Sequence, residues 1–461
     1  MMRLVSTALA ALVLSACATA PATPTASRWQ PEPYVQLDHP DWADDAVLYQ
    51  LNTRQFTEEG TFAAAELELD RLADLGVDII WLMPIHPIGE KNRKGSLGSP
   101  YSVKDYYGVN PEFGTEDDLK SFIDAAHARG MHVILDWVAN HTAWDNPLVE
   151  QHPDWYERDW DGNFMPTRWW DWSDIIDLDY SHPELREYMA SAMRYWVEEV
   201  GVDGFRCDVA GYIPLDFWEE VRADLETVKP VFMLGEFDQR DIHRKAFDAS
   251  YAWDWKNTMH DIGKGEARAN ALFGYYSENE SVWPHDAYRM TYTSNHDQNS
   301  WDAAAPDFYG PAYESAIVLS FVGEGLPLIY NGQEAYNTKQ LEFFEKDPIA
   351  WRDHPIADLF KSLIDLKTQT TALHNGAAGA RMVPVVNTAP EDVLSFTRLD
   401  ENGGVFVVMN LSPTAQTASF TDGPYAGSYV DHFSGEALTI TGATELTLPA
   451  WRYRVFVRQD G

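Results

Sequence analysis

The sequence predicts an α/β protein: a (β/α)8 TIM barrel that carries an inserted small domain and a C-terminal antiparallel β-sandwich. Three observations predict this fold. Short apolar strands alternate with helical patterns over most of the chain, one crossover is far longer than a simple loop, and the last segment alternates with a period of two. The chain has 461 residues and is 45% hydrophobic, which is enough for a large core.

The N-terminus has the features of a secretory signal. Arg3 precedes the apolar stretch LVSTALAALVLSAC, which is too short to span a membrane as a helix. Its end, LSAC, resembles a bacterial lipobox, so we interpret residues 1–17 as a lipoprotein signal peptide and Cys17 as a lipidated mature N-terminus. An ordinary secretory signal is the alternative. Residues 18–41 begin with an Ala/Thr/Pro-rich run and are predicted to be a flexible tether.

Charge and cysteine content restrict the partners and the compartment. The chain holds 34 Lys and Arg against 72 Asp and Glu, a formal charge of −38, which repels phosphate backbones and argues against nucleic-acid binding. Cys207 is the only cysteine besides Cys17, so no intramolecular disulfide is expected. We expect a periplasmic or outer-membrane protein that meets the membrane only through a lipid on Cys17.

Eight apolar segments are candidate barrel strands, and helical patterns separate them. In one such helix Thr115 is the predicted N-cap and Gly130 the stop. A doubly wound open sheet is the alternative, but no glycine-rich phosphate motif follows any strand. The barrel is assigned to residues 42–375, with strands in segments 47–56, 78–85, 132–138, 202–210, 231–236, 246–253, 289–295 and 327–332.

Two further segments do not fit the barrel repeat. The crossover after the third strand is rich in Trp, Asp and Pro, and a connection of this length is normally functional. We assign residues 141–180 to a small domain B over the barrel mouth. Residues 376–461 alternate with period two between Gly, Pro and Asp turns and are assigned to the β-sandwich.

Polar residues gather where several predicted strands end, which is where barrels of this class place their active sites. Four strand ends carry carboxylates or histidines: Asp136, Asn140 and His141 on the third strand, Arg206 and Asp208 on the fourth, Glu236 on the fifth, and His296 and Asp297 on the seventh.

The pairing of these groups suggests a chemistry. Arg206 and Asp208 are two apart on a strand and share a face, so we expect the arginine to lower the pKa of Asp208 and keep it ionised. Glu236 follows an apolar stretch on the next strand, and an apolar environment beside a negative neighbour favours its protonated form. One ionised and one protonated carboxyl, about 5 Å apart, form the arrangement of a retaining glycosidase.

The motifs at these positions resemble those of the α-amylase family of glycoside hydrolases, over about residues 42–460. The matching stretches are DWVANH (136–141), GFRCDVA (204–210), MLGE (233–236), TSNHD (293–297), DLDY (177–180), GLPLIYNGQE (325–334) and SPYSVKDYYGVNPEFGT (99–115), the last of which contains Tyr101.

This resemblance implies a retaining hydrolase of α-1,4 bonds in starch or maltodextrins that needs no cofactor for its chemistry. It implies Asp208 as nucleophile, Glu236 as general acid/base and Asp297 as transition-state stabiliser. It also implies a sugar-binding subsite lined by four further residues, Tyr101, His141, Arg206 and His296.

Three features of the sequence leave alternatives open. Gly211 and Tyr212 stand where many members have Lys-His. Asn140 matches a ligand of calcium-dependent members, but a calcium ion needs six or more oxygens, and few others are assured. Val209 after the nucleophile is common in members that cleave α-1,6 bonds, so an α-1,6-active hydrolase or a transglycosylase is the runner-up. A non-catalytic glycan-binding protein is the third reading, although all the acids are present.

Overall fold

The computed structural model describes residues 29–459, and the residues from Val35 onward form one compact unit. The predicted signal peptide and the lipidation site at Cys17 lie outside the described residues. Within the described part of the chain, the helices are all too short or too polar to span a membrane.

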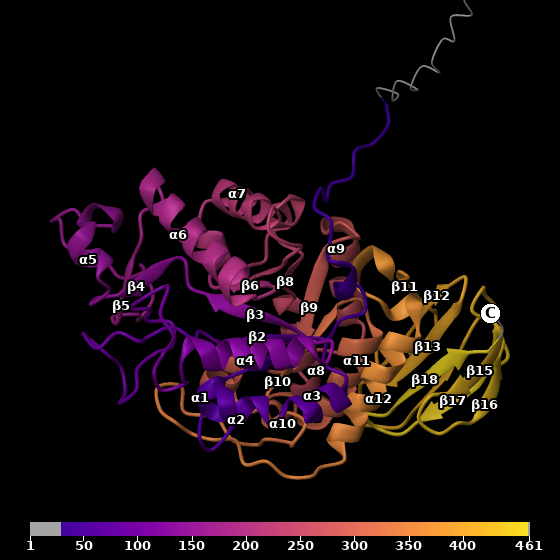
Figure 1. The fold of residues 1–461 in the computed structure, drawn as a ribbon. Coiled ribbons are helices and arrows are strands. Elements are labelled where there is room, and N and C mark those ends of the chain that lie inside the picture. The colour runs from indigo at the N-terminus through magenta and orange to yellow at the C-terminus, as the bar shows by residue number, and fades with distance from the viewer. Residues whose placement is uncertain (1–28, 460–461) are drawn as a thin grey trace, which may run out of the picture. The chain divides into compact units, whose positions relative to one another are not determined.

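Eight parallel strands close into the predicted barrel, in the order β1-β10-β9-β8-β7-β6-β3-β2 (Figure 1). All eight predicted strand segments are confirmed, but each strand is shorter than its apolar run, since the run continues into the following loop. The strands are β1 Leu48–Leu51, β2 Ile79–Leu82, β3 His132–Trp137, β6 Gly204–Cys207, β7 Phe232–Gly235, β8 Ala249–Tyr251, β9 Tyr288–Tyr292 and β10 Leu326–Tyr330.

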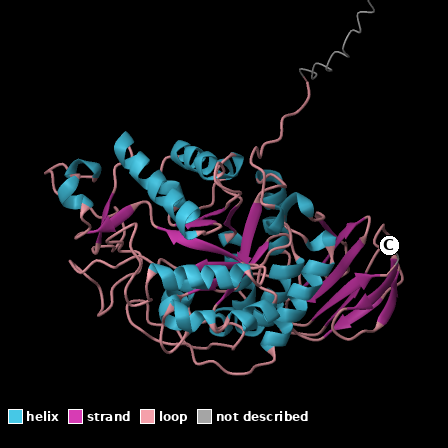
Figure 2. Cartoon of the chain, viewed as in Figure 1, coloured by secondary structure: helices cyan, strands magenta, loops and turns pink. Residues whose placement is uncertain are grey.

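Helices surround the barrel strands (Figure 2). The helix predicted after Thr115 is α4, and Thr115 forms a capping box with Asp118. The helices are α1 Thr53–Phe56, α2 Phe62–Glu66, α3 Leu69–Leu75, α4 Glu116–His127, α5 Leu148–Gln151, α6 Pro183–Tyr195, α7 Leu215–Leu225, α8 Trp253–Lys264, α9 Ala271–Val282, α10 Ala305–Tyr309, α11 Tyr313–Val322 and α12 Ile356–Gln369.

The segment before the barrel is more ordered than the sequence suggests. The backbone N–H of Gln36 donates to the carbonyl of Arg244 at 2.8 Å, and His39 Nδ1 pairs with Asp248 Oδ1 at 2.8 Å. The prediction of a flexible tether over residues 18–41 is therefore wrong for its last seven residues. They are held by a buried carboxylate on the barrel that the local sequence does not reveal.

The insert after β3 holds a short antiparallel pair, β4 His141–Ala143 with β5 Ile175–Asp177. The first residue of β4 is a candidate site residue, His141. The carbonyl of Asn140 accepts a hydrogen bond from the N–H of Leu178 at 2.9 Å, which ties the two ends of the insert together at the barrel rim.

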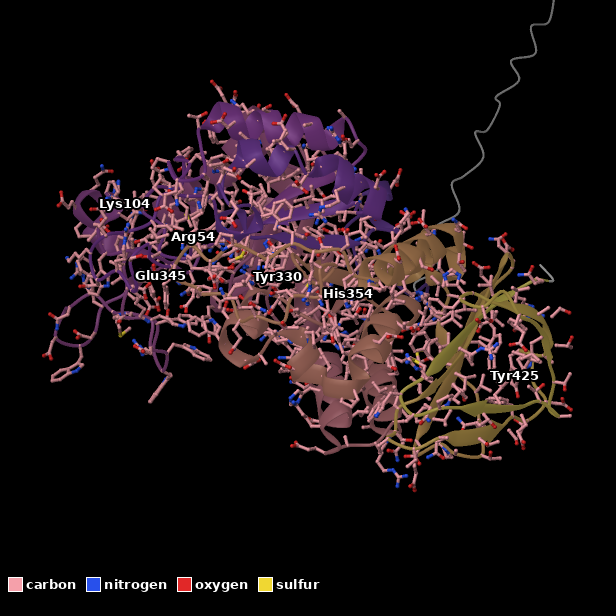
Figure 3. All side chains as sticks on the ribbon, turned by 90° about the horizontal axis from the view of Figure 1, so that it is seen from below. Arg54, Lys104, Tyr330, Glu345, His354 and Tyr425 are labelled. Carbon is pink, nitrogen blue, oxygen red and sulfur yellow. The ribbon has the colours of Figure 1, made fainter. Side chains whose placement is uncertain are left out.

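The C-terminal part is an antiparallel sandwich of a six-stranded and a two-stranded sheet. Tyr425 (Figure 3) stacks on Phe406 in its core, with ring centroids 5.6 Å apart. Its strands are β11 Met382–Pro384, β12 Val393–Asp400, β13 Gly403–Asn410, β14 Gln416–Ser419, β15 Gly427–Asp431, β16 Ala437–Ile440, β17 Glu445–Leu448 and β18 Tyr453–Arg458.

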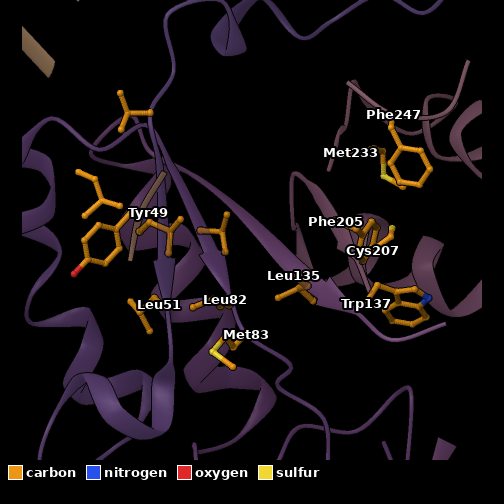
Figure 4. Close-up of a cluster of buried hydrophobic side chains, with 14 of the residues drawn as sticks. Tyr49, Leu51, Leu82, Met83, Leu135, Trp137, Phe205, Cys207, Met233 and Phe247 are labelled. Carbon is orange, nitrogen blue, oxygen red and sulfur yellow. The ribbon is translucent and has the colours of Figure 1, made fainter. Parts of the chain in front are cut away.

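Side chains alternate across the barrel wall. Phe205 and Cys207 of β6 belong to the apolar layer between barrel and helices, with Leu135 and Trp137 of β3 (Figure 4). The residue between them, Arg206, must therefore point into the barrel. This alternation places one cation inside the strand ring, at its carboxyl-terminal end.

Strand β6 packs so closely against β7 that Gly204 leaves no room for a side chain, which can be tested by substitution. A Cβ on Gly204 would lie 1.9 Å from the carbonyl oxygen of Phe232 in β7, whereas one on Gly201 would meet nothing within 4 Å, and both residues have positive φ. We expect Gly204→Ala to lower the free energy of unfolding by at least about 3 kcal/mol and Gly201→Ala by about 1 kcal/mol. Urea titrations of both variants measure this, and equal losses would contradict it.

Candidate active site

The site is organised around the side chain of Arg206, which is fully buried. Its Nη1 atom lies 2.8 Å from Asp136 Oδ1 and 3.1 Å from Asp208 Oδ1, and its Nη2 atom lies 2.7 Å from Glu236 Oε2. Three carboxyl groups from three neighbouring strands thus share a single guanidinium. The planar fork of N–H groups on arginine makes such sharing possible.

The electrostatics of Asp208 differ from the sequence expectation. Arg206 lowers the pKa of Asp208, as expected, but burial and the neighbouring Glu236 outweigh it, and the pKa is raised well above its usual range. Burial likewise raises the pKa of Asp136 to about 6, against Arg206. Burial is the largest cause for both groups, and Arg206, which contacts three acids, offsets it only in part. Neighbouring carboxyl groups with raised pKa values, such as Asp208 and Asp136, are typical of sites that carry out acid/base chemistry.

The turn after Asp208 connects the two neighbouring acids. Val209 has φ 35° and ψ 46°, a left-handed conformation that is an outlier for a β-branched residue. In this conformation its backbone N–H donates to Glu236 Oε2 at 2.8 Å. The strained peptide after one carboxylate thus orients the other.

A chain of hydrogen bonds crosses the barrel mouth toward Asp136. Gln50 Nε2 in β1 donates to His296 Nδ1 at 2.7 Å, and His296 Nε2 is 2.7 Å from the hydroxyl of Tyr101. That hydroxyl donates to Asp136 Oδ2 at 2.9 Å, as does Trp81 Nε1 at 3.1 Å. Because His296 Nδ1 accepts a bond, its proton is assigned to Nε2, and the chain has one consistent direction.

The two candidate histidines are buried and neutral. Burial lowers the pKa of His296 to about 3 and that of His141 to about 4. His141 hydrogen-bonds with the backbone of Tyr101 and faces the ring of Trp172 at 6.0 Å. Asp297 lies 3.4 Å from His296 Nε2 and keeps 45% of its side chain exposed. The predicted site residues therefore form one contiguous cluster with an accessible carboxylate at its edge.

A group of aromatic side chains lies beside the turn that follows Asp208. A Cβ on Gly211 would lie 2.2 Å from the ring of Phe237, so this ring occupies the space that a side chain at position 211 would need. The ring of Tyr212 lies 6.3 Å from Phe237, and its hydroxyl accepts a bond from Trp170 Nε1 at 3.1 Å. Trp170 stacks on Trp172 with 5.2 Å between centroids.

The surroundings of Asn140 do not fit a calcium site. Asn140 Nδ2 donates to Asp177 Oδ1 at 3.1 Å, and the Thr167 hydroxyl donates to the same oxygen at 2.5 Å. The amide therefore turns its N–H group, rather than an oxygen, toward the one carboxylate beside it. Calcium requires six to eight oxygens, so the structure gives the predicted metal ligand Asn140 no support.

Cys207 sits between Arg206 and Asp208 in sequence but on the opposite side of the strand. The thiol is fully buried and free, and burial raises its pKa well above the usual range. A protonated, enclosed thiol takes no part in chemistry at the barrel mouth.

Two parts of the chain match known domain families. Residues 51–365 match the family described as alpha amylase, catalytic domain, and residues 385–454 match the one described as alpha amylase, C-terminal all-beta domain. The first match alone covers more than half of the chain.

Individual relatives agree with these matches. Alpha-amylase MalA of Haloarcula japonica is 30% identical over 91% of this chain, which spans 63% of the length of that relative. The crystal structure of a noncanonic maltogenic alpha-amylase, AmyB from Thermotoga neapolitana, has a TM-score of 0.82 and 31% identity over 90% of this chain and 98% of its own. An alpha-amylase structure from Lactobacillus plantarum has a TM-score of 0.81 and 31% identity over 91% and 100%.

The contact between Gly211 and Phe237 predicts a coupling. Gly211→Ala should lower the free energy of unfolding by about 1–3 kcal/mol because the ring must be displaced. Phe237→Leu in the same chain should recover most of that loss, since the smaller side chain leaves room for the methyl group. Urea titrations of the two single variants and the double variant measure the coupling, and strictly additive losses would show that the ring does not fill this space.

Buried His296 predicts a pH-dependent stability. Its pKa falls from 6.5 in the unfolded chain to about 3 in the folded one, so only the unfolded state takes up a proton between these values. Stability is therefore lost as pH falls from 6.5 toward 3, by about 2 kcal/mol at pH 5 from this residue. Between pH 7 and pH 5, His296→Gln should lose about 2 kcal/mol less unfolding free energy than the wild type. Equal losses in both proteins would refute the assignment.

Proposed function

This chain belongs to the α-amylase family of glycoside hydrolases, and from that membership we propose that it is a retaining hydrolase of α-1,4-linked glucans such as starch and maltodextrins. The observation that carries the proposal is the pair of carboxyl groups of Asp208 and Glu236 on the single guanidinium of Arg206. A carboxylate nucleophile and a carboxylic acid on neighbouring strands are the two groups that a retaining double displacement requires.

In the first step, a carboxylate oxygen of Asp208 attacks the anomeric carbon as the glycosidic C–O bond breaks. Glu236 gives its proton to the departing oxygen. Glu236 Oε2 accepts the N–H of Val209 and faces Arg206, so we assign the transferred proton to the other oxygen, Oε1. The product is a covalent β-glycosyl ester on Asp208.

In the second step, the Glu236 carboxylate takes a proton from a water molecule, and the resulting attack on the anomeric carbon releases Asp208. Both steps pass through a cationic sugar, and the surrounding acids favour that charge. Arg206 faces three carboxyl groups, of which Glu236 carries the proton before the first step, and Asp297 adds a further acid at the open edge. Tyr101 and neutral His296 supply an aromatic face and polar atoms for the sugar.

A second candidate function is α-1,6 hydrolysis or glycosyl transfer by the same two steps. Val209 favours this function, because valine at that position is common in family members that cleave α-1,6 bonds. The residues on the leaving-group side of the site also favour it. That side has the aromatic surface of Phe237, Tyr212 and Trp170 where Lys-His would otherwise stand. A flat apolar surface binds a sugar acceptor without competing for the proton of Glu236.

One experiment separates these functions. Starch, maltotriose, pullulan, isomaltotriose, dextran and cyclodextrins are each incubated with the protein, and the products are followed in time with their anomeric form. The proposal expects α-anomeric products from the α-1,4-linked substrates first. Products from isomaltotriose alone would favour the second function, and β-anomers would refute retention.

The catalytic assignment has its own test. Asp208→Asn should lower kcat at least about 10³-fold on every active substrate, because the amide is not a nucleophile. Asp216→Asn is a matched control, since Asp216 is an aspartate with 65% of its side chain exposed near the start of α7. Turnover by Asp208→Asn at the control's rate would exclude Asp208 as nucleophile.

A further inference from the structure

A second cluster of ionisable side chains lies at the other end of the barrel. His127 is the last residue of α4, His132 is the first residue of β3, and Asp203 immediately precedes β6. These positions are the amino-terminal ends of the strands, opposite to the active-site end. In barrels of this class that face serves stability rather than catalysis. The mechanism proposed above uses none of these residues.

The donor atoms of this cluster converge on one point. One ring nitrogen of His127, one ring nitrogen of His132 and one carboxylate oxygen of Asp203 all lie within 4.8 Å of one another. Asp203 Oδ2 is 2.7 Å from His127 Nε2 and 3.7 Å from His132 Nδ1. The second distance is too long for a hydrogen bond. It is close to the separation of about 3.3 Å between two ligands of a tetrahedral zinc ion with bonds of about 2.0–2.1 Å.

One nitrogen atom of the cluster is buried without a hydrogen-bond partner among the described residues. This atom is His132 Nδ1. A buried polar atom without a partner costs about 1–3 kcal/mol, so it needs an explanation. A bound cation at the convergence point would supply the missing partner.

Neighbouring contacts hold the three groups in place. The backbone N–H of Val133 donates to Asp203 Oδ2 at 2.8 Å, and the Lys229 ammonium donates to Oδ1 at 2.8 Å. Lys229 thus binds Oδ1, while Oδ2, which also accepts the Val133 N–H, is the oxygen that lies 2.7 Å from His127 Nε2 and 3.7 Å from His132 Nδ1. The ring of Trp42 stacks on His132 at 3.9 Å with 14° between planes, which fixes the imidazole orientation. Supporting contacts of this kind surround metal ligands in proteins.

We propose that His127, His132 and Asp203 bind a zinc ion, with a water molecule from solvent in the fourth position. Two imidazoles and one carboxylate match the ligand preference of zinc rather than that of calcium or magnesium. About one third of the His127 side chain is exposed, so the ion has a route from solvent and the imidazole can shift the few tenths of an ångström that binding requires. The ion would join α4, β3 and β6 at the base of the barrel.

The test is zinc binding by the full chain after removal of metals with EDTA. Equilibrium dialysis against ZnCl2 with elemental analysis should give one ion per chain for the wild type. At a free zinc concentration a hundredfold above the dissociation constant, the melting temperature should rise by about 3 °C. His127→Gln and His132→Gln should each weaken binding at least tenfold and reduce that rise to about half or less.

A matched variant separates this site from unspecific binding to histidines. His182→Gln removes a histidine that also lies near two carboxylates, Asp154 at 3.9 Å and Asp179 at 3.8 Å. Among residues 29–459 it does not belong to a group of three side chains with metal-ligand spacing. This variant should bind zinc like the wild type. Hydrolytic activity should be unchanged in His127→Gln and His132→Gln, because these two residues lie at the end of the barrel opposite to the mouth. Unchanged zinc binding by His127→Gln and His132→Gln, or no binding by the wild type at 1 mM ZnCl2, would overturn the proposal. Neither result would bear on the glucan hydrolase assignment.

Discussion

The active site depends on one buried cation that is shared among three acids. Arg206 cannot lose its charge under ordinary conditions, and it is fully enclosed, so its neighbours must supply the balancing charge. Asp136 does so from the inside of the barrel, and Asp208 and Glu236 do so from the rim. Removing one partner from such a buried group typically costs about 3–5 kcal/mol. The geometry of the two rim carboxyls is therefore maintained by the stability of the fold itself.

The remaining contacts of the site restrict how this charge group can rearrange. The left-handed peptide at Val209 fixes Glu236 from one side. The chain of hydrogen bonds from Gln50 through His296 and Tyr101 fixes Asp136 from the other side. Of the three carboxyl groups around Arg206, that of Asp208 has the fewest hydrogen bonds and ion pairs. This suits a group that must form and release a covalent bond. The site combines a rigid frame with one comparatively free carboxyl.

The sequence predicted most of the fold because buried parallel strands appear as continuous apolar runs, and eight of them are present. Acids at the ends of such runs, such as Asp208 and Glu236, stand out because their chemistry contradicts their surroundings. Gln50, Trp81 and Phe237 do not stand out. Gln50 and Trp81 reach the site only when β1 closes against β2 and β10, and Phe237 is an ordinary apolar residue until its ring is seen over Gly211. The order of residues 35–41 and the approach of His127 to Asp203 depend likewise on partners far away in the chain.

The buried thiol of Cys207 can be used to measure how often the barrel wall opens. The thiol lies in the apolar layer behind the strand that carries Arg206 and Asp208, enclosed by Phe205 and Trp137 (Figure 4). A thiol reagent can reach it only when β6 separates from the helices that cover it. In a chain with Cys17→Ser, the labelling rate of the Cys207 sulfur would then follow the local unfolding of the strand that carries the site, distinct from the unfolding of the sandwich. The rate at which the catalytic strand β6 opens can thus be measured without an introduced probe.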